Sequence, residues 1–179
     1  MRPGPRPLPM YGAMPDFTLQ DQNGRTARLA DLRGKISVAD VIFTRCAGEC
    51  PVMTAHMQAI EKLLPKEAPV EFVSFTTDPA HDTPEILKTY ALRYGADENR
   101  WMFLTGSKPA LRGAIIDGLK LAAMDKEVSQ QQNPEDLFVH SAKFVLIDGA
   151  GQIRGYFDGE ADGAAAEVAA AIAQLEKER

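Results

Sequence analysis

The chain has 179 residues and a mass of 19.5 kDa, and 45% of its residues are hydrophobic and 25% charged. These are the proportions of a single globular domain, and they exclude a disordered or fibrous protein. Twenty basic and twenty-five acidic residues give a net charge of −5. This balance argues against a nucleic-acid partner, because phosphate contacts need a basic surface.

The N-terminal segment is rich in proline, with five of the twelve prolines in the first fifteen residues. We expect residues 1–9 to be extended and residues 10–179 to form the folded domain. The segment lacks the apolar stretch of a secretory signal. Composition leaves two possibilities open: a cytoplasmic protein, or one whose targeting or anchoring segment has been removed.

The first half of the chain predicts a β-hairpin followed by two strand–helix units. Asn23-Gly24 is a strong hairpin signal between two short alternating segments. Pro51 suits the first turn of a helix, and Asp82 or Thr83 before Pro84 marks the start of another. In chain order we expect strands 16–20, 25–29 and 36–44, helix 51–64, strand 70–76 and helix 84–95.

The second half predicts a strand and a helix, a polar loop, and then two strands and a last helix. Ser107 is expected to cap a helix that runs to about Asp117. The predicted elements are strand 101–104, helix 108–117, an extended stretch 119–124, loop 126–137, strands 142–148 and 152–157, and helix 162–177 with Ala165, Val168, Ile172 and Leu175 on its buried face. This order predicts an α/β sandwich with a central sheet and helices on both faces.

The two cysteines, Cys46 and Cys50, lie where a buried strand turns into a helix. Two are too few for a disulfide scaffold. If the turn is helical, residues four apart share a face with Cβ atoms about 5–6 Å apart, which suits either a shared metal ion or a disulfide. The positive end of the helix should lower the pKa of a nearby thiol. The pair therefore predicts a metal or redox site rather than two inert core thiols, and its spacing does not separate the two.

The three histidines are weaker candidates on sequence alone. His140 follows the polar loop and precedes a buried strand, so it is either a loop histidine or a third ligand. His56 is expected at the surface of the helix that follows the cysteines. His81 lies in a polar loop and is expected to be solvated.

Several other residues near the cysteines allow two interpretations. Asp78 either orients a metal ligand or forms an Asx-turn before Pro79. Met53 and Met57 are possible thioether ligands, but their helical spacing favours core packing. Arg45 would suit a peroxidatic cysteine, although this position is compatible with many roles.

A set of motifs occurs in a fixed order along the chain. The motifs are Phe43-Thr44-Arg45-Cys46, Cys50-Pro51, Thr76-Thr77-Asp78-Pro79, Asp82-Thr83-Pro84, Leu104-Thr105-Gly106 and Val139-His140-Ser141. With them the chain resembles the Sco/SenC family of copper-binding assembly factors from about Leu8 to Phe157. The resemblance implies a thioredoxin-like three-layer sandwich with an N-terminal β-hairpin. It also implies that one copper ion, as Cu(I) or Cu(II), is bound by Cys46, Cys50 and His140.

The resemblance further implies a metallochaperone that helps to build the binuclear copper centre of cytochrome c oxidase. The expected partner is the copper-bearing subunit of the oxidase, with thioredoxin-like reductants or other copper chaperones as further partners. Family members usually face the periplasm or the mitochondrial intermembrane space on an N-terminal tether. We therefore expect a periplasmic or membrane-anchored monomer whose anchor is absent from this chain.

The alternative function is that of a thiol–disulfide oxidoreductase that reduces the copper-site cysteines of a partner protein. This reaction needs only Cys46 and Cys50 and does not depend on His140; otherwise we do not expect a classical enzyme. The chain departs from the family pattern at Ala47, where proline is frequent, and at Glu49, where an apolar residue is frequent. The charge of Glu49 should raise the pKa of the thiols and weaken copper binding.

Overall fold

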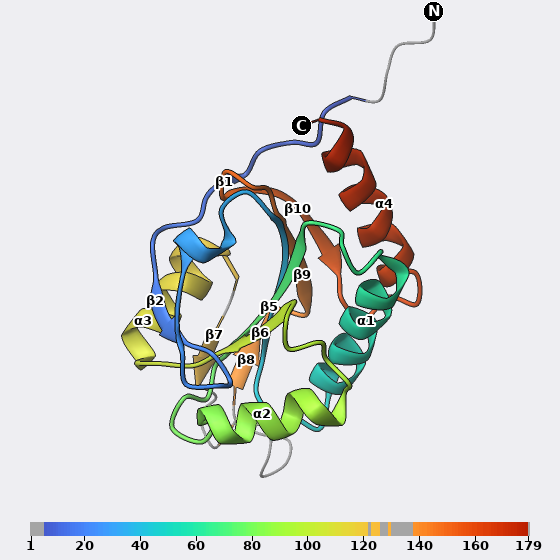
Figure 1. The fold of residues 1–179 in the computed structure, drawn as a ribbon. Coiled ribbons are helices and arrows are strands. Elements are labelled where there is room, and N and C mark those ends of the chain that lie inside the picture. Colours follow the sequence, from blue (N-terminus) through green and yellow to red (C-terminus); the bar gives the residue numbers. More distant parts are fainter. Residues whose placement is uncertain (1–5, 122, 126–128, 130–137, 179) are drawn as a thin grey trace, which may run out of the picture.

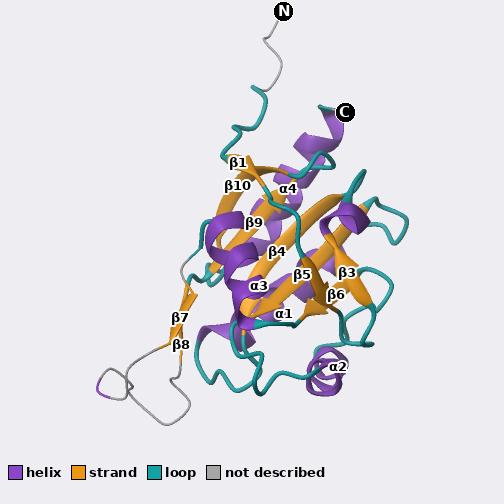
Figure 2. Ribbon diagram, turned by 90° about the vertical axis from the view of Figure 1, so that its left-hand side faces the viewer, coloured by secondary structure: helices purple, strands orange, loops and turns teal. Residues whose placement is uncertain are grey.

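The computed structural model describes residues 6–121, 123–125, 129 and 138–178, and its centre is a six-stranded mixed sheet (Figures 1 and 2). Strands β4, β5 and β6 are parallel, and β9 runs antiparallel to β4. The strand order is β1 (Gly12–Ala13), β10 (Gln152–Asp158), β9 (Lys143–Ile147), β4 (Ile36–Ile42), β5 (Val70–Thr76) and β6 (Trp101–Leu104).

The central strands are almost continuously apolar because helices or loops cover both of their faces. All seven residues of β4 are buried. Its parallel pairing with β5 runs in register from Ile36 and Val70 to Ile42 and Thr76. A parallel pair needs a crossover connection, which α1 (Glu49–Leu63) supplies. Both strands therefore end at the same edge of the sheet, where the loops that follow them meet.

Two apolar cores lie on the two faces of the sheet. On one face α1 packs together with α2 (Pro84–Arg93) and α4 (Ala164–Lys177). On the other face lie α3 (Lys108–Arg112), a π-helical turn (Gly113–Gly118) and the hairpin of β2 (Thr18–Gln20) and β3 (Thr26–Arg28). A 3-10 turn, Leu29–Leu32, follows the hairpin. This arrangement confirms the predicted α/β sandwich with helices on both faces and an N-terminal hairpin.

Most helix starts agree with the predicted caps. The side chain of Thr83 accepts a hydrogen bond from the Ile86 N–H (3.4 Å), and that of Ser107 accepts one from the Ala110 N–H (3.2 Å). The helix predicted to reach Asp117 ends as an α-helix at Arg112 and continues as the π-helical turn. The two-residue strand β1 was not predicted, because its residues have no strand pattern of their own.

The last helix differs from its prediction by two residues. It begins at Ala164 rather than at 162, and Ala164 is fully buried while Ala165 is only half-buried. Within the expected stretch 119–124, only residues 123 and 124 belong to a strand, β7 (Ala123–Asp125), which pairs with β8 (Phe138–His140). The predicted loop 126–137 lies outside the described residues except for Ser129. No helix in the described part of the chain is long and apolar enough to cross a membrane.

Candidate thiol and metal site

The cysteines lie in the turn between β4 and α1. The Cys46 N–H donates to the Phe43 carbonyl oxygen (3.1 Å), which bends the chain after the strand, and α1 then begins at Glu49. Cys46 is half-buried, whereas Cys50 is fully buried against the core. Neither forms a disulfide, and the two sulfurs are hydrogen-bonded to each other. The structure therefore brings the pair together in one place, with one sulfur facing outward and the other inward.

The environment of Cys50 favours its neutral thiol. The hydrogen bond with Cys46 is the largest cause, and burial follows; together they raise the pKa of the Cys50 thiol. The charge of Glu49 raises this pKa further, in the direction expected for this departure. The expectation that the helix end would lower the thiol pKa is therefore wrong for Cys50. A metal ion or an oxidant that engages Cys50 must displace its proton.

His140 is the last residue of β8, and its backbone pairs with Ala123. Its side chain lies outside the described part of the structure. Strand β9 follows after two residues and runs antiparallel to β4, with Val145 opposite Ala39. The start of β9 therefore lies at the edge where β4 ends. Ala142 lies near α1, because a Cβ added to Gly159 would lie 3.3 Å from the Ala142 carbonyl oxygen and 3.0 Å from the side chain of Met53.

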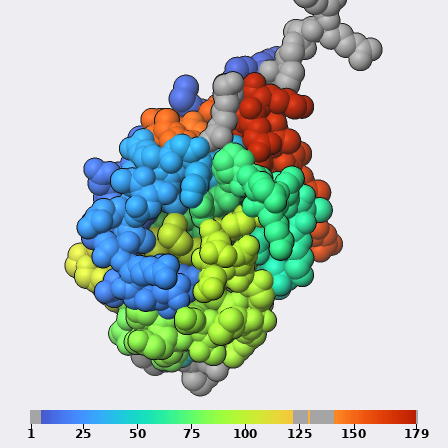
Figure 3. All heavy atoms as spheres, in the orientation of Figure 1, coloured from blue at the N-terminus to red at the C-terminus, as the bar shows by residue number. Residues whose placement is uncertain are grey.

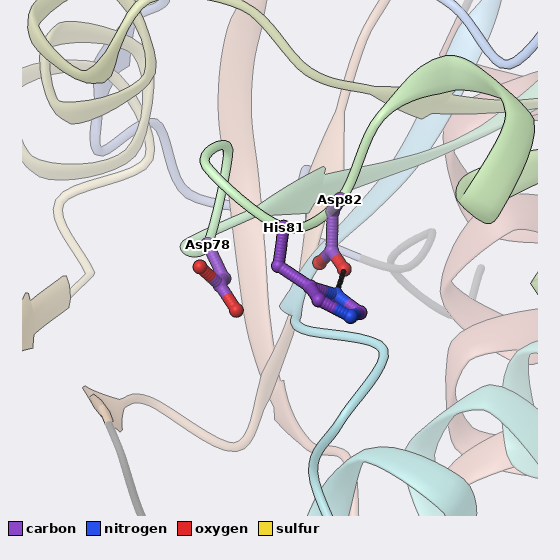
Figure 4. Close-up of side chains that lie close together, drawn as sticks. All are labelled: Asp78, His81 and Asp82. Carbon is purple, nitrogen blue, oxygen red and sulfur yellow. Dashed lines mark hydrogen bonds and ion pairs between the residues drawn. The ribbon is translucent and has the colours of Figure 1, made fainter.

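The loop after β5 contributes a compact polar cluster to the same edge (Figure 4). The fully buried Asp82 carboxylate accepts hydrogen bonds from the Thr44 N–H (3.1 Å), the Thr44 hydroxyl and the Thr76 hydroxyl (2.5 Å). The His81 Nδ1 atom lies 3.0 Å from Asp82. The buried Asp78 carboxylate accepts from Arg45 through Nη2 (2.6 Å) and Nε (3.2 Å). The cluster thus ties the cysteine turn to the neighbouring loop.

Among the described residues, Asp78, His81 and Asp82 form the one group of three or more His, Cys, Asp or Glu side chains whose ligand atoms lie close enough to hold a metal ion. Their carboxylates already accept hydrogen bonds from Arg45 and from the two threonines, so the group's evident role is to fix the turn. His81 was expected to be solvated, but 36% of its side chain is exposed and it is paired with Asp82. Asp78 binds Arg45, the residue before Cys46, and its orientation of a metal ligand stays a prediction.

The remaining candidates lie on α1. Met53 and Met57 are fully buried core residues, as their spacing predicted. His56 is half-buried, and its Nδ1 atom lies 2.8 Å from the Gly159 carbonyl oxygen. These residues are committed to packing and to a backbone contact.

One buried acidic residue was not singled out from the sequence. Asp40, in β4, is fully buried and has no access to solvent. Burial, followed by smaller contributions that include the charges of Cys50 and Asp40, raises the pKa of Tyr90, whose hydroxyl lies 2.8 Å from that of Thr54. Asp40 therefore lies in the same neighbourhood as Cys50 and Tyr90. The sequence could have pointed to Asp40, because it is the one acidic residue in a predominantly apolar strand.

Comparison with known proteins identifies the family. The family model described as SCO1/SenC matches residues 8–177. The chain belongs to the SCO1/SenC family. It is 34% identical to a SCO1 protein homolog of Bacillus subtilis over 84% of this chain and 76% of that protein. It is 32% identical to a putative copper-binding protein of Stutzerimonas stutzeri over 83% of this chain and 71% of that protein.

Solved structures of the SCO1/SenC family confirm the thioredoxin-like fold. A SCO1/SenC family lipoprotein from Bacillus anthracis superposes with a TM-score of 0.82 at 30% identity, covering 92% of this chain and 95% of that one. BsSco, a member of the Sco family of cytochrome c oxidase assembly proteins in which a disulfide switch was identified, has a TM-score of 0.80 at 28% identity, over 97% and 100% of the two chains.

Proposed function

We propose that this SCO1/SenC protein is a copper metallochaperone that binds one copper ion through Cys46, Cys50 and His140. Its task is to supply copper for the binuclear centre of cytochrome c oxidase, with the copper-bearing subunit as the receiving partner. The observation that carries the proposal is the pair of reduced, mutually hydrogen-bonded thiols at the β4–α1 turn. A relative described as a putative copper-binding protein and a structural neighbour from an oxidase assembly family support it.

The two sulfurs are suited to a soft metal ion because thiolates prefer Cu(I). They lie within hydrogen-bond reach of each other where the chain enters α1, with Cys46 before the helix and Cys50 in its first turn. Copper would replace the proton of Cys50, so binding should release protons and weaken as the pH falls. The half-buried Cys46 is the ligand that an incoming protein can reach, while Cys50 anchors the metal from inside.

The connection between β8 and β9 supports His140 as the third ligand. Strand β9 starts at the edge where β4 ends, and Ala142 lies near α1. His140 is only two positions before Ala142 in the sequence. A set of two thiolates and one imidazole leaves an open face, which ligand exchange with a partner requires. For location we propose a membrane-anchored protein facing the periplasm, by analogy with the lipoprotein from Bacillus anthracis.

A second function is favoured by the same thiol pair and by the disulfide switch of BsSco. In this reaction the Cys46 thiolate attacks a partner disulfide, forms a mixed disulfide and releases one partner thiol. The Cys50 thiol then loses its proton and attacks the Cys46 sulfur, which releases the second partner thiol. The partner gains two electrons, and the Cys46–Cys50 pair becomes a disulfide. The exposure difference between the two sulfurs assigns the attack to Cys46.

Anaerobic titration with Cu(I) against a competing chelator tests the proposal. The reduced wild-type protein should bind one Cu(I) tightly, and Cys46→Ser, Cys50→Ser and His140→Ala should each lose that binding. The matched control is His56→Ala, which removes a histidine from α1 and should leave the stoichiometry unchanged.

The two functions differ in their need for His140. Reduction of a disulfide-bonded peptide by the protein should survive in His140→Ala if the thiols act alone. Retention of tight Cu(I) in His140→Ala would contradict the three-ligand site. Weak binding in the wild-type protein together with rapid disulfide reduction would favour the oxidoreductase.

A further inference from the structure

A groove of about 290 Å³ opens beside the cysteine turn, between that turn and α2. Its size is at the lower end for a small-molecule pocket, so it suits one or two side chains of a docked polypeptide better than a whole cofactor. Its lining consists of Thr44, Arg45, His81, Ile86, Thr89, Tyr90 and Arg93.

The α2 wall of this groove is one face of the helix. Ile86, Thr89, Tyr90 and Arg93 follow each other at spacings of three, one and three residues, so their side chains form a continuous stripe. Tyr90 is almost fully buried and Ile86 is half-buried, which gives the groove an apolar floor. Thr89 and Arg93 are exposed and form its rim.

The charge of the groove is opposite to that of the whole chain. The chain carries a net charge of −5, yet the ionised side chains that line the groove are Arg45 and Arg93. The nearby carboxylates are buried and engaged: Asp78 binds Arg45, and Asp82 accepts from Thr44 and Thr76. The exposed Glu85 lines a separate pocket, between α2 and the hairpin. The lining of the groove is therefore cationic, and Glu49, the half-buried acidic residue three positions after Cys46, is not part of it.

The position of the groove decides what reaches it. Thr44 and Arg45 directly precede Cys46, and Arg45 remains 42% exposed although it is paired with Asp78. A protein that exchanges copper or a disulfide with Cys46 must lay its own chain across this turn. Side chains that flank its reacting residues would then reach the groove.

We propose that this groove docks an acidic, extended segment of the protein that exchanges copper or thiols with Cys46. The proposal rests on the function proposed above, and it names the chemistry of the partner. Carboxylates of the segment would meet Arg93 and the free side of Arg45, while an apolar side chain would lie on Ile86 and Tyr90. Opposite charge around the site would also speed the encounter between the two proteins.

Peptide binding to the reduced, metal-free protein tests the groove directly. The probes are a short peptide rich in glutamate and a matched peptide with glutamine at the same places, followed through the amide chemical shifts of the protein. The acidic peptide should bind more tightly, should shift Thr44, Thr89 and Arg93, and should lose its advantage at high ionic strength.

Two matched pairs of variants locate the effect. Thr89→Glu and Thr89→Gln place side chains of the same shape in the groove and differ in charge, so the first should bind the acidic peptide about two- to fivefold more weakly. Arg93→Gln should lower affinity by a similar factor. Lys88→Gln removes a positive charge from the same helix outside the groove and should change little.

Equal binding of the two peptides, or an equal loss in Lys88→Gln and Arg93→Gln, would overturn the proposal. The Cu(I) titration of the wild-type protein is a separate measurement and needs no peptide. Failure to bind Cu(I) would contradict the copper function while peptide binding still reports on the groove. Tight Cu(I) binding without a preference for the acidic peptide would contradict the groove alone.

Discussion

The two ends of the central sheet use arginine–carboxylate pairs in different ways. At the end where β4 begins, Arg154 donates to Asp148 (3.0 Å) and to Glu178 (2.6 Å), and its side chain is only 10% exposed. The same guanidinium donates to the carbonyl oxygens of Leu8 and Pro9, so it joins the N-terminal segment to α4. Figure 1 shows the described part of the N-terminal segment (blue) and the last turns of α4 (red) at this end of the molecule.

At the end where β4 stops, Arg45 binds one buried carboxylate, that of Asp78, and 42% of its side chain stays in solvent. Figure 3 shows the hairpin (blue) and α2 (yellow-green) on one face of the molecule, and they share a pocket. Arg154 is enclosed by the segments that it joins, whereas Arg45 keeps a free side next to Cys46. We therefore expect substitutions at the first end to change stability, and those at the second to change reactivity.

The largest expected effect is on copper binding. Cys50→Ser should lower Cu(I) affinity by roughly a hundredfold or more, because loss of a ligand exceeds the ~10–100-fold effect of losing a supporting contact. Arg154→Met, at the other end of the sheet, should bind Cu(I) like the wild-type protein. Chelator competition measures both, and a similar loss in the two variants would contradict the separation of the ends.

The next effect is on folding. Arg154→Met should lower the free energy of unfolding by about 2 kcal/mol, between the values for exposed and fully buried pairs, because two partly buried carboxylates lose their partner. Arg25→Met, in the exposed turn of the hairpin, is the control and should change stability by less than about 0.5 kcal/mol. Urea denaturation measures both, and equal stabilities would show that the ion pairs of Arg154 are dispensable for stability.

The contacts that Glu178 makes with Arg154 and Leu8 should also make the stability of the protein depend on pH in the acid range. The Leu8 N–H, together with Arg154, lowers the pKa of Glu178 below its usual 4.5. A carboxylate with a lowered folded-state pKa stabilises the protein above the unfolded value, and this contribution is lost as the pH falls from about 4.5 through the folded value. Glu178→Gln should therefore lose less stability than the wild-type protein between neutral pH and acid. Parallel acid-unfolding curves would contradict this assignment.

The smallest effect concerns Glu49 beside the thiols. Its charge is a minor cause of the raised pKa of Cys50. Glu49→Gln should lower that pKa slightly and speed alkylation of Cys50 by about two- to threefold in mildly alkaline buffer, since the charge of one half-buried neighbour contributes well under 1 kcal/mol. Mass spectrometry of the alkylated protein measures this rate. Glu67→Gln, in an exposed loop, is the control. Equal rates of Cys50 alkylation in the two variants would show that the charge of Glu49 does not influence this thiol.

The sequence predicted the elements whose signals are local. The bounds of β5 and β6 agree with prediction because each is an apolar run between polar breaks. Thr83 and Ser107 cap their helices because a hydroxyl before a helix meets its first free N–H groups. The cysteine pair was found because its two residues are only four positions apart, but the turn that joins them is not helical: α1 begins at Glu49, after Cys46.

The contacts missed from the sequence join residues far apart in the chain. Arg45 and Asp78 are 33 positions apart, and Arg154 and Leu8 are 146 apart. No periodicity marks such pairs, because the sheet alone brings their loops together. The hydrogen bond with the neighbouring Cys46 thiol, followed by burial, likewise reversed the expected direction of the pKa shift at Cys50. His140 needed the family resemblance, since its spacing from the cysteines has no local meaning.

X-ray absorption at the copper edge of the Cu(I)-loaded protein tests most directly whether Cys46, Cys50 and His140 hold one metal ion together. The wild-type spectrum should fit two sulfur ligands and one imidazole nitrogen. In His140→Ala, whose weaker binding requires loading at high protein and copper concentration, the bound copper should keep the two sulfurs and lose the imidazole signature, while His56→Ala should match the wild-type spectrum. Identical spectra for the wild-type protein and His140→Ala would contradict the three-ligand site.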